Sequence, residues 1–343
     1  MPHLALAMVG FGNVGRALAQ LLLSKQDQLK KAYDITFQVN GIATISHGMA
    51  IDPAGIKLSQ ALALIESGQS LAKLNRQPDI DSILGFIQAV PADVLFENSP
   101  VNHLTGQPAI NHLKKALARG MHVITANKGP VAHAYAELNE LAARANRRFM
   151  FESTVMDGAP IFALFRDGLP SAELRGFQGI LNSCTNLILG RMETGESFEE
   201  AVAYAQSIGI TETDPSADID GWDSAIKVAT LATVLMGEPL KPQQVNRTGI
   251  REITPAMRAG ARRAGLRWKL VCSCQREGNR LEARVAPEQI SPDSPLYSIN
   301  GTSSFVQFEL DVLPGLGIVE SNPGPETTAY GLLADLINAV RAI

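Results

Sequence analysis

Cysteine is scarce in this sequence. The three cysteines, Cys184, Cys272 and Cys274, cannot all pair with one another, which argues against a disulfide framework and favours a reducing compartment. Cys272 and Cys274 fall near the end of an apolar segment that we interpret as a strand. No second group of cysteine or histidine lies nearby in the sequence, so we interpret them as strand residues and not as metal ligands.

Long hydrophobic runs and long basic runs are also missing. The longest nearly unbroken apolar stretch, Val228–Gly237, is much shorter than the roughly 20 residues that cross a bilayer. The first residues lack the basic segment that begins a signal peptide, so we expect a cytoplasmic protein that does not associate with membranes. The formal net charge is -4, and we expect no nucleic-acid partner.

The composition that remains is typical of a packed enzyme. Of the 343 residues, 45% are hydrophobic and 19% are charged, and the length suggests about two domains. Strand-like and helix-like segments alternate through residues 1–150, which predicts an α/β domain with a Rossmann-type, doubly wound parallel sheet. Residues 151–321 mix both kinds of segment and predict a second, α+β domain. We expect residues 322–343 to form a helix that packs back on the first domain.

Individual elements follow from the hydrophobic pattern. In the first domain we expect the strands Leu4–Val9, Phe37–Ile45, Asp93–Glu97 and Met121–Thr125, and the helices Arg16–Leu23, Ala109–Ala118 and Val131–Ala145. In the second we expect the helices Gly158–Arg166, Phe198–Ile208 and Asp220–Met236, and the strands Glu173–Leu181, Leu281–Val285 and Ser304–Val312.

Six residues near the N-terminus match the dinucleotide-binding pattern G-x-G-x-x-G: Gly10, Phe11, Gly12, Asn13, Val14 and Gly15. They follow a strand-like run and open a helix-like run, as the pattern requires. The first glycine permits the tight turn, the second lets the backbone approach a pyrophosphate, and the third allows close helix–strand packing. The helix N-terminus then offers free N–H groups to the phosphates. The alternative is an ordinary glycine-rich turn.

The residue that would bind the cofactor ribose is not evident. Folds that prefer NAD place Asp or Glu near the end of the second strand. Here residues 42–48 contain neither an acid nor an arginine, and Asp34 precedes the strand. Ser46 and His47 either touch the ribose or its 2′-phosphate or are plain loop residues. The sequence leaves the choice between NAD and NADP open.

Residues 209–227 hold the densest polar chemistry. Five carboxylates precede a lysine in an amphipathic helix: Glu212, Asp214, Asp218, Asp220, Asp223 and then Lys227. A proline at 215 puts the first two acids on a loop, and we expect Asp220 to cap the following helix. Asp223 and Lys227 are four residues apart and can interact. The segment either binds a substrate ammonium group and donates a proton from Lys227, or it is a solvated loop with an ordinary ion pair.

Two further candidates follow predicted strands. Lys128 comes after the strand 121–125, and Asn98 and Ser99 come after the strand 93–97. Open α/β sheets bind ligands at the edge formed by the carboxyl ends of their strands. Lys128 is therefore a candidate to reach substrate or nicotinamide, and Asn98 and Ser99 are candidate cofactor contacts. The alternative is a surface lysine with two turn residues.

Several segments together resemble homoserine dehydrogenase. They read GFGNVG at 10–15, TANK at 125–128, ESTVMDGAPI at 152–161, GILNSCTNLIL at 179–189 and GITETDPSADIDGWDSAIK at 209–227. The last is the most specific, because its spacing of acids, glycine and lysine is hard to reach by chance. The resemblance implies a homodimeric, NAD- or NADP-dependent oxidoreductase, with catalysis and dimerisation in the second domain. It would interconvert L-aspartate 4-semialdehyde and L-homoserine in threonine, methionine and isoleucine biosynthesis.

The resemblance also implies roles for residues. Lys227 would donate the proton to the aldehyde oxygen, and Glu212, Asp218 and Asp223 would hold the substrate or order its site. Lys128 would line the active site near the nicotinamide. Gly324, in the segment 322–324 that replaces the glycine–alanine–glycine cluster of the family, would contact the cofactor. A monovalent cation, Na⁺ or K⁺, would be held by oxygen atoms of Glu152, Val155, Asp157 and Ala159.

Three segments depart from the family pattern, namely 156–158, 182–186 and 322–324, and they keep alternatives open. One is a family dehydrogenase for another amino-acid aldehyde or alcohol. Aspartate-semialdehyde dehydrogenase is another, which would need Cys184 as a nucleophile with a histidine partner. The third is a non-catalytic dinucleotide-sensing protein, which would have no use for Glu212, Asp223 and Lys227 together.

Overall fold

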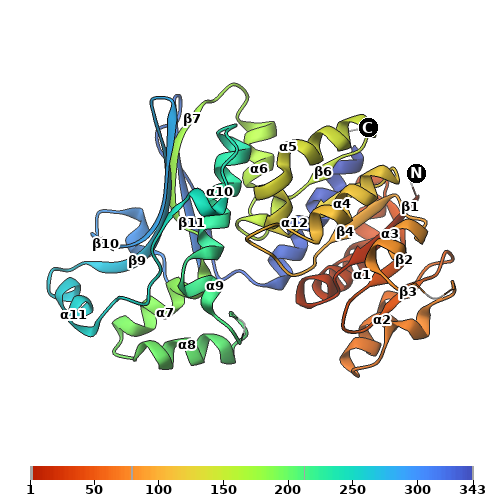
Figure 1. Cartoon of the computed structure of the whole chain (residues 1–343), viewed down its shortest axis with the longest axis horizontal. Helices are drawn as coiled ribbons and strands as arrows, with labels where there is room; N and C mark the ends of the chain where they lie inside the picture. Colours follow the sequence, from red (N-terminus) through yellow and green to blue (C-terminus); the bar gives the residue numbers. More distant parts are fainter. Residues whose placement is uncertain (1–2, 79, 212, 342–343) are drawn as a thin grey trace. The chain divides into compact units, whose positions relative to one another are not determined.

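The computed structural model describes residues 3–78, 80–211 and 213–341. The chain forms two compact units, whose elements are labelled in Figure 1. The first unit comprises Met1–Pro160 together with Gly324–Ile343, and the second comprises Ile161–Pro323. The C-terminal segment therefore belongs to the same unit as the N-terminal segment.

The first unit is built on a six-stranded sheet. Its strands are β1 (His3–Val9), β2 (Thr36–Ala43), β3 (Met49–Ile51), β4 (Val94–Glu97), β5 (His122–Thr125) and β6 (Phe149–Met150). They lie in the order β3-β2-β1-β4-β5-β6, and every neighbouring pair is parallel except β2 with β3. All residues of β4 and β5 are buried, as expected for a parallel sheet covered on both faces. This strand order is that of doubly wound dinucleotide-binding sheets, so the predicted α/β fold is confirmed.

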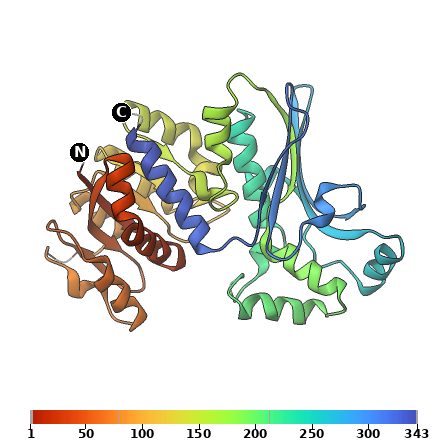
Figure 2. The same ribbon diagram turned by 180° about the vertical axis from the view of Figure 1, so that it is seen from behind.

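Helices cover both faces of this sheet. On one face α1 (Asn13–Tyr33) and α12 (Pro325–Arg341) lie side by side, as Figure 2 shows. On the other face α4 (Ala109–Ala118) packs between α3 (Ile83–Ala89) and α5 (Lys128–Arg144), as seen in Figure 1. The short helix α2 (Leu58–Glu66) contacts α1.

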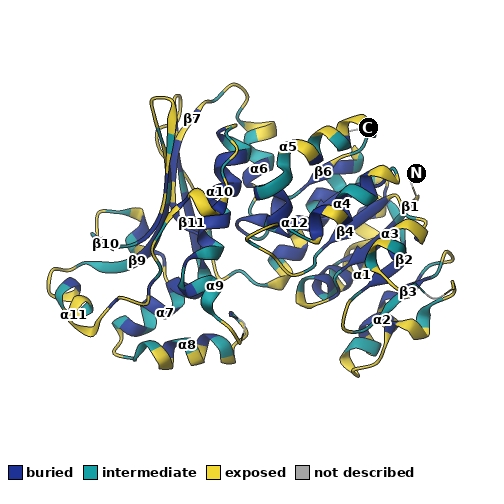
Figure 3. Cartoon of the chain, in the orientation of Figure 1, coloured by how far each residue is buried: buried dark blue, intermediate teal, exposed yellow. Residues whose placement is uncertain are grey.

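The helices α1 and α12 share one hydrophobic core. Leu18 and Leu22 of α1 and Leu332 and Leu336 of α12 are completely buried in the same cluster as Leu6 of β1. The members of each helical pair are four residues apart, so they lie on one face of their helix. Figure 3 shows the buried faces of the elements in dark blue. The C-terminal helix is thus an integral part of the first unit.

The second unit is built on a mostly antiparallel sheet. Its strands are β7 (Leu174–Ile180), β8 (Asn246–Arg247), β9 (Arg267–Glu277), β10 (Arg280–Ile290), β11 (Ser304–Leu310) and β12 (Leu316–Glu320), in the order β12-β11-β7-β9-β10-β8. Only β8 with β10 is a parallel pair among these strands. The helices are α6 (Ile161–Ala163), α7 (Ser183–Glu193), α8 (Phe198–Ser207), α9 (Ser216–Ile219), α10 (Trp222–Leu235) and α11 (Pro255–Arg263). The predicted second, α+β unit is confirmed.

Two local predictions in this unit were wrong. Asp220 does not cap α10, because the N-cap is Gly221 with a left-handed φ of 78°. Asp220 pairs with Arg251. The helix expected from residue 158 begins at Ile161 and passes into a π-helical turn, Leu164–Gly168.

All three cysteines are free and buried, and Cys272 and Cys274 are residues of β9, as predicted. In the part of the chain that the structure describes, every helix is too short or too polar to cross a membrane.

Candidate active site

The glycine turn between β1 and α1 has the geometry that the sequence pattern predicts. Gly10 has a φ of 91°, and a Cβ atom at this position would lie 2.4 Å from the carbonyl oxygen of Asn98. A Cβ atom at Gly15 would lie 2.6 Å from the carbonyl oxygen of Gly10. Gly12 is different, since a Cβ atom there meets no described atom within 4 Å. Gly10 and Gly15 are therefore required by packing, whereas Gly12 keeps a space open.

Two features of this turn fit the phosphates of a dinucleotide. The N-cap of α1, Gly12, makes no side-chain capping bond among the described residues, and the first turn of the helix contains no acid, so its N–H groups and positive end suit an anion. Asn98, whose backbone lies against Gly10, has its side-chain Oδ1 and Nδ2 buried and without a hydrogen-bond partner in the described structure. Buried polar atoms are almost always paired, so Asn98 is suited to bind a ligand here.

The end of β2 has no acidic side chain to bind a ribose. Residues 44–48 form a turn in which Thr44 Oγ1 accepts a hydrogen bond from the His47 N–H at 2.8 Å. Ser46 Oγ and His47 Nδ1 lie 2.8 Å apart, so these two side chains bond to one another. This turn therefore carries neither an acid that would bind a ribose 2′-hydroxyl nor an arginine that would bind a 2′-phosphate.

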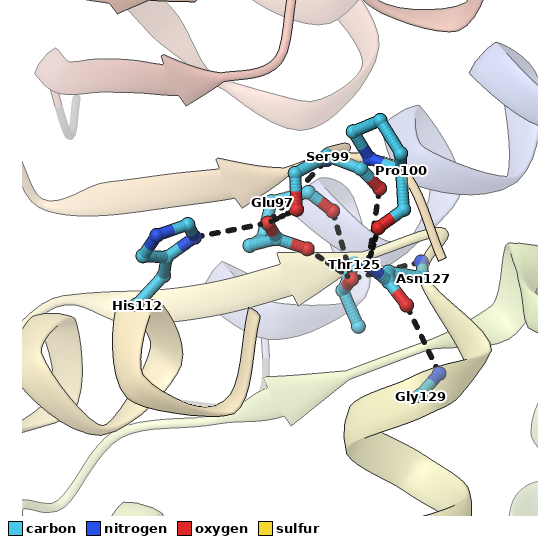
Figure 4. A network of polar contacts seen from close by, with 7 residues as sticks. All are labelled: Glu97, Ser99, Pro100, His112, Thr125, Asn127 and Gly129. Atoms are coloured by element: carbon cyan, nitrogen blue, oxygen red, sulfur yellow. Dashed lines mark hydrogen bonds and ion pairs between the residues drawn. The ribbon is translucent and has the colours of Figure 1, made fainter. Parts of the chain in front are cut away.

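Glu97, the last residue of β4, is the centre of a polar network that sequence analysis missed (Figure 4). Its carboxylate is completely buried. Oε1 accepts from Ser99 Oγ and the Ser99 N–H and lies 3.2 Å from His112 Nδ1, and Oε2 lies 3.4 Å from Thr125 Oγ1. Four contacts on one carboxylate connect the loop after β4 with β5 and α4. The signal available in the sequence was an acid at the end of an otherwise apolar strand.

Asn127 extends this network to the turn that carries Lys128. Its Nδ2 donates to the carbonyl oxygen of Ser99 at 3.0 Å, and its Oδ1 caps α5 by accepting from the Gly129 N–H at 3.0 Å. Lys128 is the first residue of α5. The loops after β4 and β5 are thus bonded to one another, and Lys128, Asn98 and Ser99 lie at the same edge of the sheet.

In the second unit, Lys227 and Asp223 form the expected pair on α10. The Lys227 ammonium lies 3.4 Å from Asp223 Oδ2, and the Lys227 side chain is only 13% exposed. Its Nζ also donates to the carbonyl oxygen of Leu181, at the end of β7, at 2.6 Å. The prediction of a partly buried lysine is confirmed, and Asp223 lies in the first turn of its helix as expected.

Asp218 is the second carboxylate of this group. Its Oδ1 accepts from Asn182 Nδ2 at 2.7 Å, and its Oδ2 accepts from Thr211 Oγ1 at 2.6 Å. Burial raises the pKa of Asp218, and the negative charge of Asp223 raises it further, whereas the bonds from Thr211 and Asn182 act in the opposite direction. Sequence analysis missed Asn182, Thr211 and the carbonyl of Leu181.

Asp214 and Asp220, two further acids of the segment 209–227, have other partners than Asp218, Asp223 and Lys227. Asp214 accepts from the Ser216 N–H at 3.0 Å, and Asp220 pairs with Arg251. Both contacts are local or surface interactions. Glu212, which we expected to bind substrate, lies outside the described residues.

The thiol of Cys184 lies next to Asp218, in surroundings that favour its protonated form. Burial raises the pKa of this thiol, and the charge of Asp218 raises it further. Nucleophilic cysteines have lowered pKa values, because the thiolate is the reactive form. This observation argues against the phosphorylating aspartate-semialdehyde dehydrogenase alternative.

The segment expected to hold a cation packs against α12 in the first unit. The N–H of Glu152 donates to Asp335 Oδ2 at 2.8 Å. Asp157 has a left-handed φ of 41°, and its Oδ1 accepts from Thr328 Oγ1. The backbone between Val155 and Ala159 is therefore irregular at Asp157, and its carbonyl oxygens are the atoms that could bind a cation. Among the described residues, no three His, Cys, Asp or Glu side chains gather to hold a metal.

Gly324 lies at the start of α12. Its carbonyl oxygen accepts from Thr327 Oγ1 at 2.6 Å and from the Thr327 N–H at 3.0 Å. Gly324 is therefore the residue directly before α12, and its carbonyl oxygen is bonded to the first turn of that helix.

Lys227, Asp218 and Asp223 form what we call the lysine–carboxylate group. The doubly wound sheet, its open glycine turn and this group together define a dinucleotide-dependent oxidoreductase. Two family sequence models match the chain: homoserine dehydrogenase, NAD binding domain, over residues 10–152, and homoserine dehydrogenase over residues 160–337. The chain belongs to the homoserine dehydrogenase family, and it is an NAD(P)-dependent oxidoreductase.

Two relatives and one solved structure match the chain over nearly their whole length. An NAD(+)-dependent homoserine dehydrogenase from Pseudomonas canavaninivorans is 35% identical, over 98% of this chain and 96% of its own. A homoserine dehydrogenase from Methanocaldococcus jannaschii is 38% identical, over 96% of this chain and 97% of its own. The solved structure of a hyperthermophilic archaeal homoserine dehydrogenase in complex with NADPH superposes with a TM-score of 0.84, at 29% identity, and covers 100% of this chain and 99% of that one.

Proposed function

We propose that this chain interconverts L-homoserine and L-aspartate 4-semialdehyde with NAD or NADP, as a cytoplasmic enzyme of threonine, methionine and isoleucine biosynthesis. The observation that carries the proposal is the partly buried ammonium of Lys227, which contacts the Leu181 carbonyl oxygen and Asp223 within the region that matches the family. When bound, the nicotinamide cofactor supplies or accepts the hydride.

Lys227 is the general acid and base of the proposed reaction. Its ammonium gives a proton to the aldehyde oxygen when the alcohol forms, and the amine takes it back in the reverse direction. Asp223, 3.4 Å away, stabilises the charged form of the lysine. The substrate α-ammonium group binds the acids of the same segment, Asp218, Asp223 and Glu212. Lys128 is the second catalytic lysine.

The cofactor binds the first unit in this proposal. The glycine turn, Gly10, Phe11, Gly12, Asn13, Val14 and Gly15, holds the pyrophosphate with the N–H groups of α1. Asn98, Ser99, Lys128 and Gly324 provide further contacts. The open space at Gly12 and the unpaired side chain of Asn98 support this assignment.

A monovalent cation, Na⁺ or K⁺, binds the segment of Glu152, Val155, Asp157 and Ala159 in this proposal. Backbone carbonyl oxygens are suitable ligands for such an ion. Activity measured with Na⁺, with K⁺ and with tetramethylammonium at equal ionic strength tests the site. Equal rates in all three salts would contradict it.

The enzyme acts as a homodimer in this proposal. Val319 of the edge strand β12 is 56% exposed, and an exposed apolar residue on a sheet edge favours pairing with another chain. Sedimentation equilibrium measures the mass in solution, and a monomer at all concentrations would contradict the assignment.

The assay of the proposed function follows the absorbance of the reduced nicotinamide with L-homoserine and either NAD⁺ or NADP⁺. Turnover of L-homoserine well above that of other amino alcohols is expected. Turnover of another amino alcohol in its place would favour the related dehydrogenase. Tight cofactor binding with no turnover of any amino alcohol would favour a dinucleotide sensor.

A further inference from the structure

The junction between β7 and α7 contacts Lys227, Asp218 and Asp223. The carbonyl oxygen of Leu181 accepts from Lys227 Nζ at 2.6 Å. The next residue, Asn182, donates from Nδ2 to Asp218 Oδ1 at 2.7 Å and to Asp223 Oδ2 at 3.0 Å. Two consecutive residues therefore contact one ammonium and two carboxylates.

The orientation of the Asn182 amide is fixed from its other end. Oδ1 accepts from the Thr185 N–H at 2.8 Å and from Thr185 Oγ1 at 2.9 Å, which caps α7. A backbone N–H can only donate, so the oxygen must face Thr185 and the amide nitrogen must face the carboxylates. Both amide protons and the oxygen are used, and the side chain is buried. No other rotation of this amide satisfies all four contacts.

The Asn182 amide is neutral and donates two hydrogen bonds to a pair of carboxylates that repel one another. Asp218 and Asp223 both bond to one nitrogen, so their negative charges repel at short range. Asp218 is faced by Asp223 and Lys227 from α10, by the thiol of Cys184 from α7 and by the hydroxyl of Thr211. The Asn182 amide donates to both carboxylates and is itself held by a helix cap.

We propose that Asn182 is a positioning residue of the reaction, which holds Asp218 and Asp223 apart and in place beside Lys227. The inference rests on the proposed function, because the positioned groups are those that bind the substrate ammonium and protonate its oxygen. The bond from Asn182 favours the ionised form of Asp218 and lowers its pKa. Loss of this bond therefore moves the titration of Asp218 to higher pH.

The two roles of Asn182 can be separated by substitution. Asn182→Ser and Asn182→Asp both keep an oxygen that caps a helix, because Ser and Asp are good N-caps, but neither places an amide donor between the carboxylates. Ser197→Ala is the matched control, because it removes the capping box of α8 in the same unit without touching the lysine–carboxylate group. Thermal unfolding of all three variants reports the cost in stability.

We expect both Asn182 variants to lose about 10²-fold in kcat/KM, as small misplacements of reacting groups do. We expect the acid limb of their pH profiles to move to higher pH, whereas Ser197→Ala keeps the parent profile. Carboxylate ¹³C NMR titration of Asp218 in the parent and in Asn182→Ser gives the same comparison without turnover. A higher pKa in the variant supports the proposal.

Two results would overturn the inference. One is an Asn182→Ser enzyme with parental kcat/KM and pH profile. The other is an unchanged NMR titration of Asp218. If the parent protein fails to oxidise L-homoserine, the proposed function fails, and the NMR comparison still decides whether Asn182 governs the carboxylates.

Discussion

The ammonium of Lys227 donates to the carbonyl oxygen of Leu181 at 2.6 Å, so α10 is bonded at this lysine to the residue that follows β7. A carbonyl oxygen binds an ammonium without neutralising it. The charge is balanced instead by Asp223, at 3.4 Å. Lys227 is thus held in one position while its proton remains available.

Replacing Lys227 with Met tests its role as the proton donor. The variant keeps an apolar chain of similar length, and it removes the ammonium. We expect kcat to fall by about 10²–10⁴-fold, the range for loss of a general acid, with the dissociation constant of NADPH unchanged. Stopped-flow turnover and fluorescence titration of the cofactor measure the two quantities. Turnover near that of the parent would remove Lys227 from this role.

Asp218→Asn is expected to stabilise the protein and to lower its activity. Burial and Asp223 raise the pKa of Asp218 in the folded chain. The folded state therefore binds more protons than the unfolded state above the ordinary carboxyl pKa, and this group makes folding less favourable as pH rises through that window. Asparagine removes this penalty. We therefore expect the variant to have a higher Tm than the parent at neutral pH, and its Tm to decrease less as pH rises. A lower Tm, or full activity, would contradict this account.

The fold was predictable because its signals are local. The glycine pattern directly after an apolar run predicted β1 and the start of α1, and the helix Ala109–Ala118 has the predicted bounds. The elements that were missed between residues 46 and 92 are short: β3 has three residues, and α2 and α3 have nine and seven. So few residues give too few repeats for a hydrophobic period to show.

The site was predictable only where its members are close in sequence. Asp223 and Lys227 are one helical turn apart, so their spacing alone predicted the pair. Asn182 meets Asp218 and Asp223 across 36 and 41 residues, and Glu97 meets Thr125 across 28. Such contacts depend on tertiary folding, and an asparagine or a buried glutamate carries no periodic signal of its partner.

Glu97→Gln is expected to destabilise the first unit. The Glu97 carboxylate is completely buried, accepts hydrogen bonds from Ser99 and Thr125, and contacts His112. In the variant, the amide nitrogen of glutamine would face one of these donors. An unpaired buried polar group costs about 1–3 kcal/mol. Urea unfolding measures the free energy, and cofactor titration is expected to show weaker binding, because the Ser99 loop loses its anchor.

Glu140→Gln is the matched control for the Glu97 experiment. Glu140 forms an exposed ion pair with Arg144 on α5, and its side chain is 61% exposed. Such surface pairs contribute about 0–1 kcal/mol, so the same chemical change is expected to have little effect there. Equal stability of the two variants would show that the buried network does not stabilise the unit.

His122 is expected to make the protein sensitive to acid. Burial, together with the charges of Arg147 and Arg148, lowers the pKa of His122 from 6.5 to about 4, so the folded chain keeps the imidazole neutral above that pH. Between these values the unfolded chain binds the extra proton, and stability falls as pH decreases from 6.5 to about 4. We expect a shallower decrease for His122→Gln in unfolding experiments across this range. An identical slope in both proteins would contradict the assignment.

The glycine turn allows a test that separates folding from cofactor binding. A methyl group at Gly12 meets no described atom within 4 Å, whereas one at Gly15 would lie 2.6 Å from the carbonyl oxygen of Gly10. Gly12→Ala is therefore expected to keep the parental Tm but to raise the dissociation constant of NADPH about tenfold or more, since the methyl would enter the space that we propose for the pyrophosphate. Gly15→Ala is expected to lower Tm as well. Undiminished cofactor affinity in Gly12→Ala would place the phosphates elsewhere.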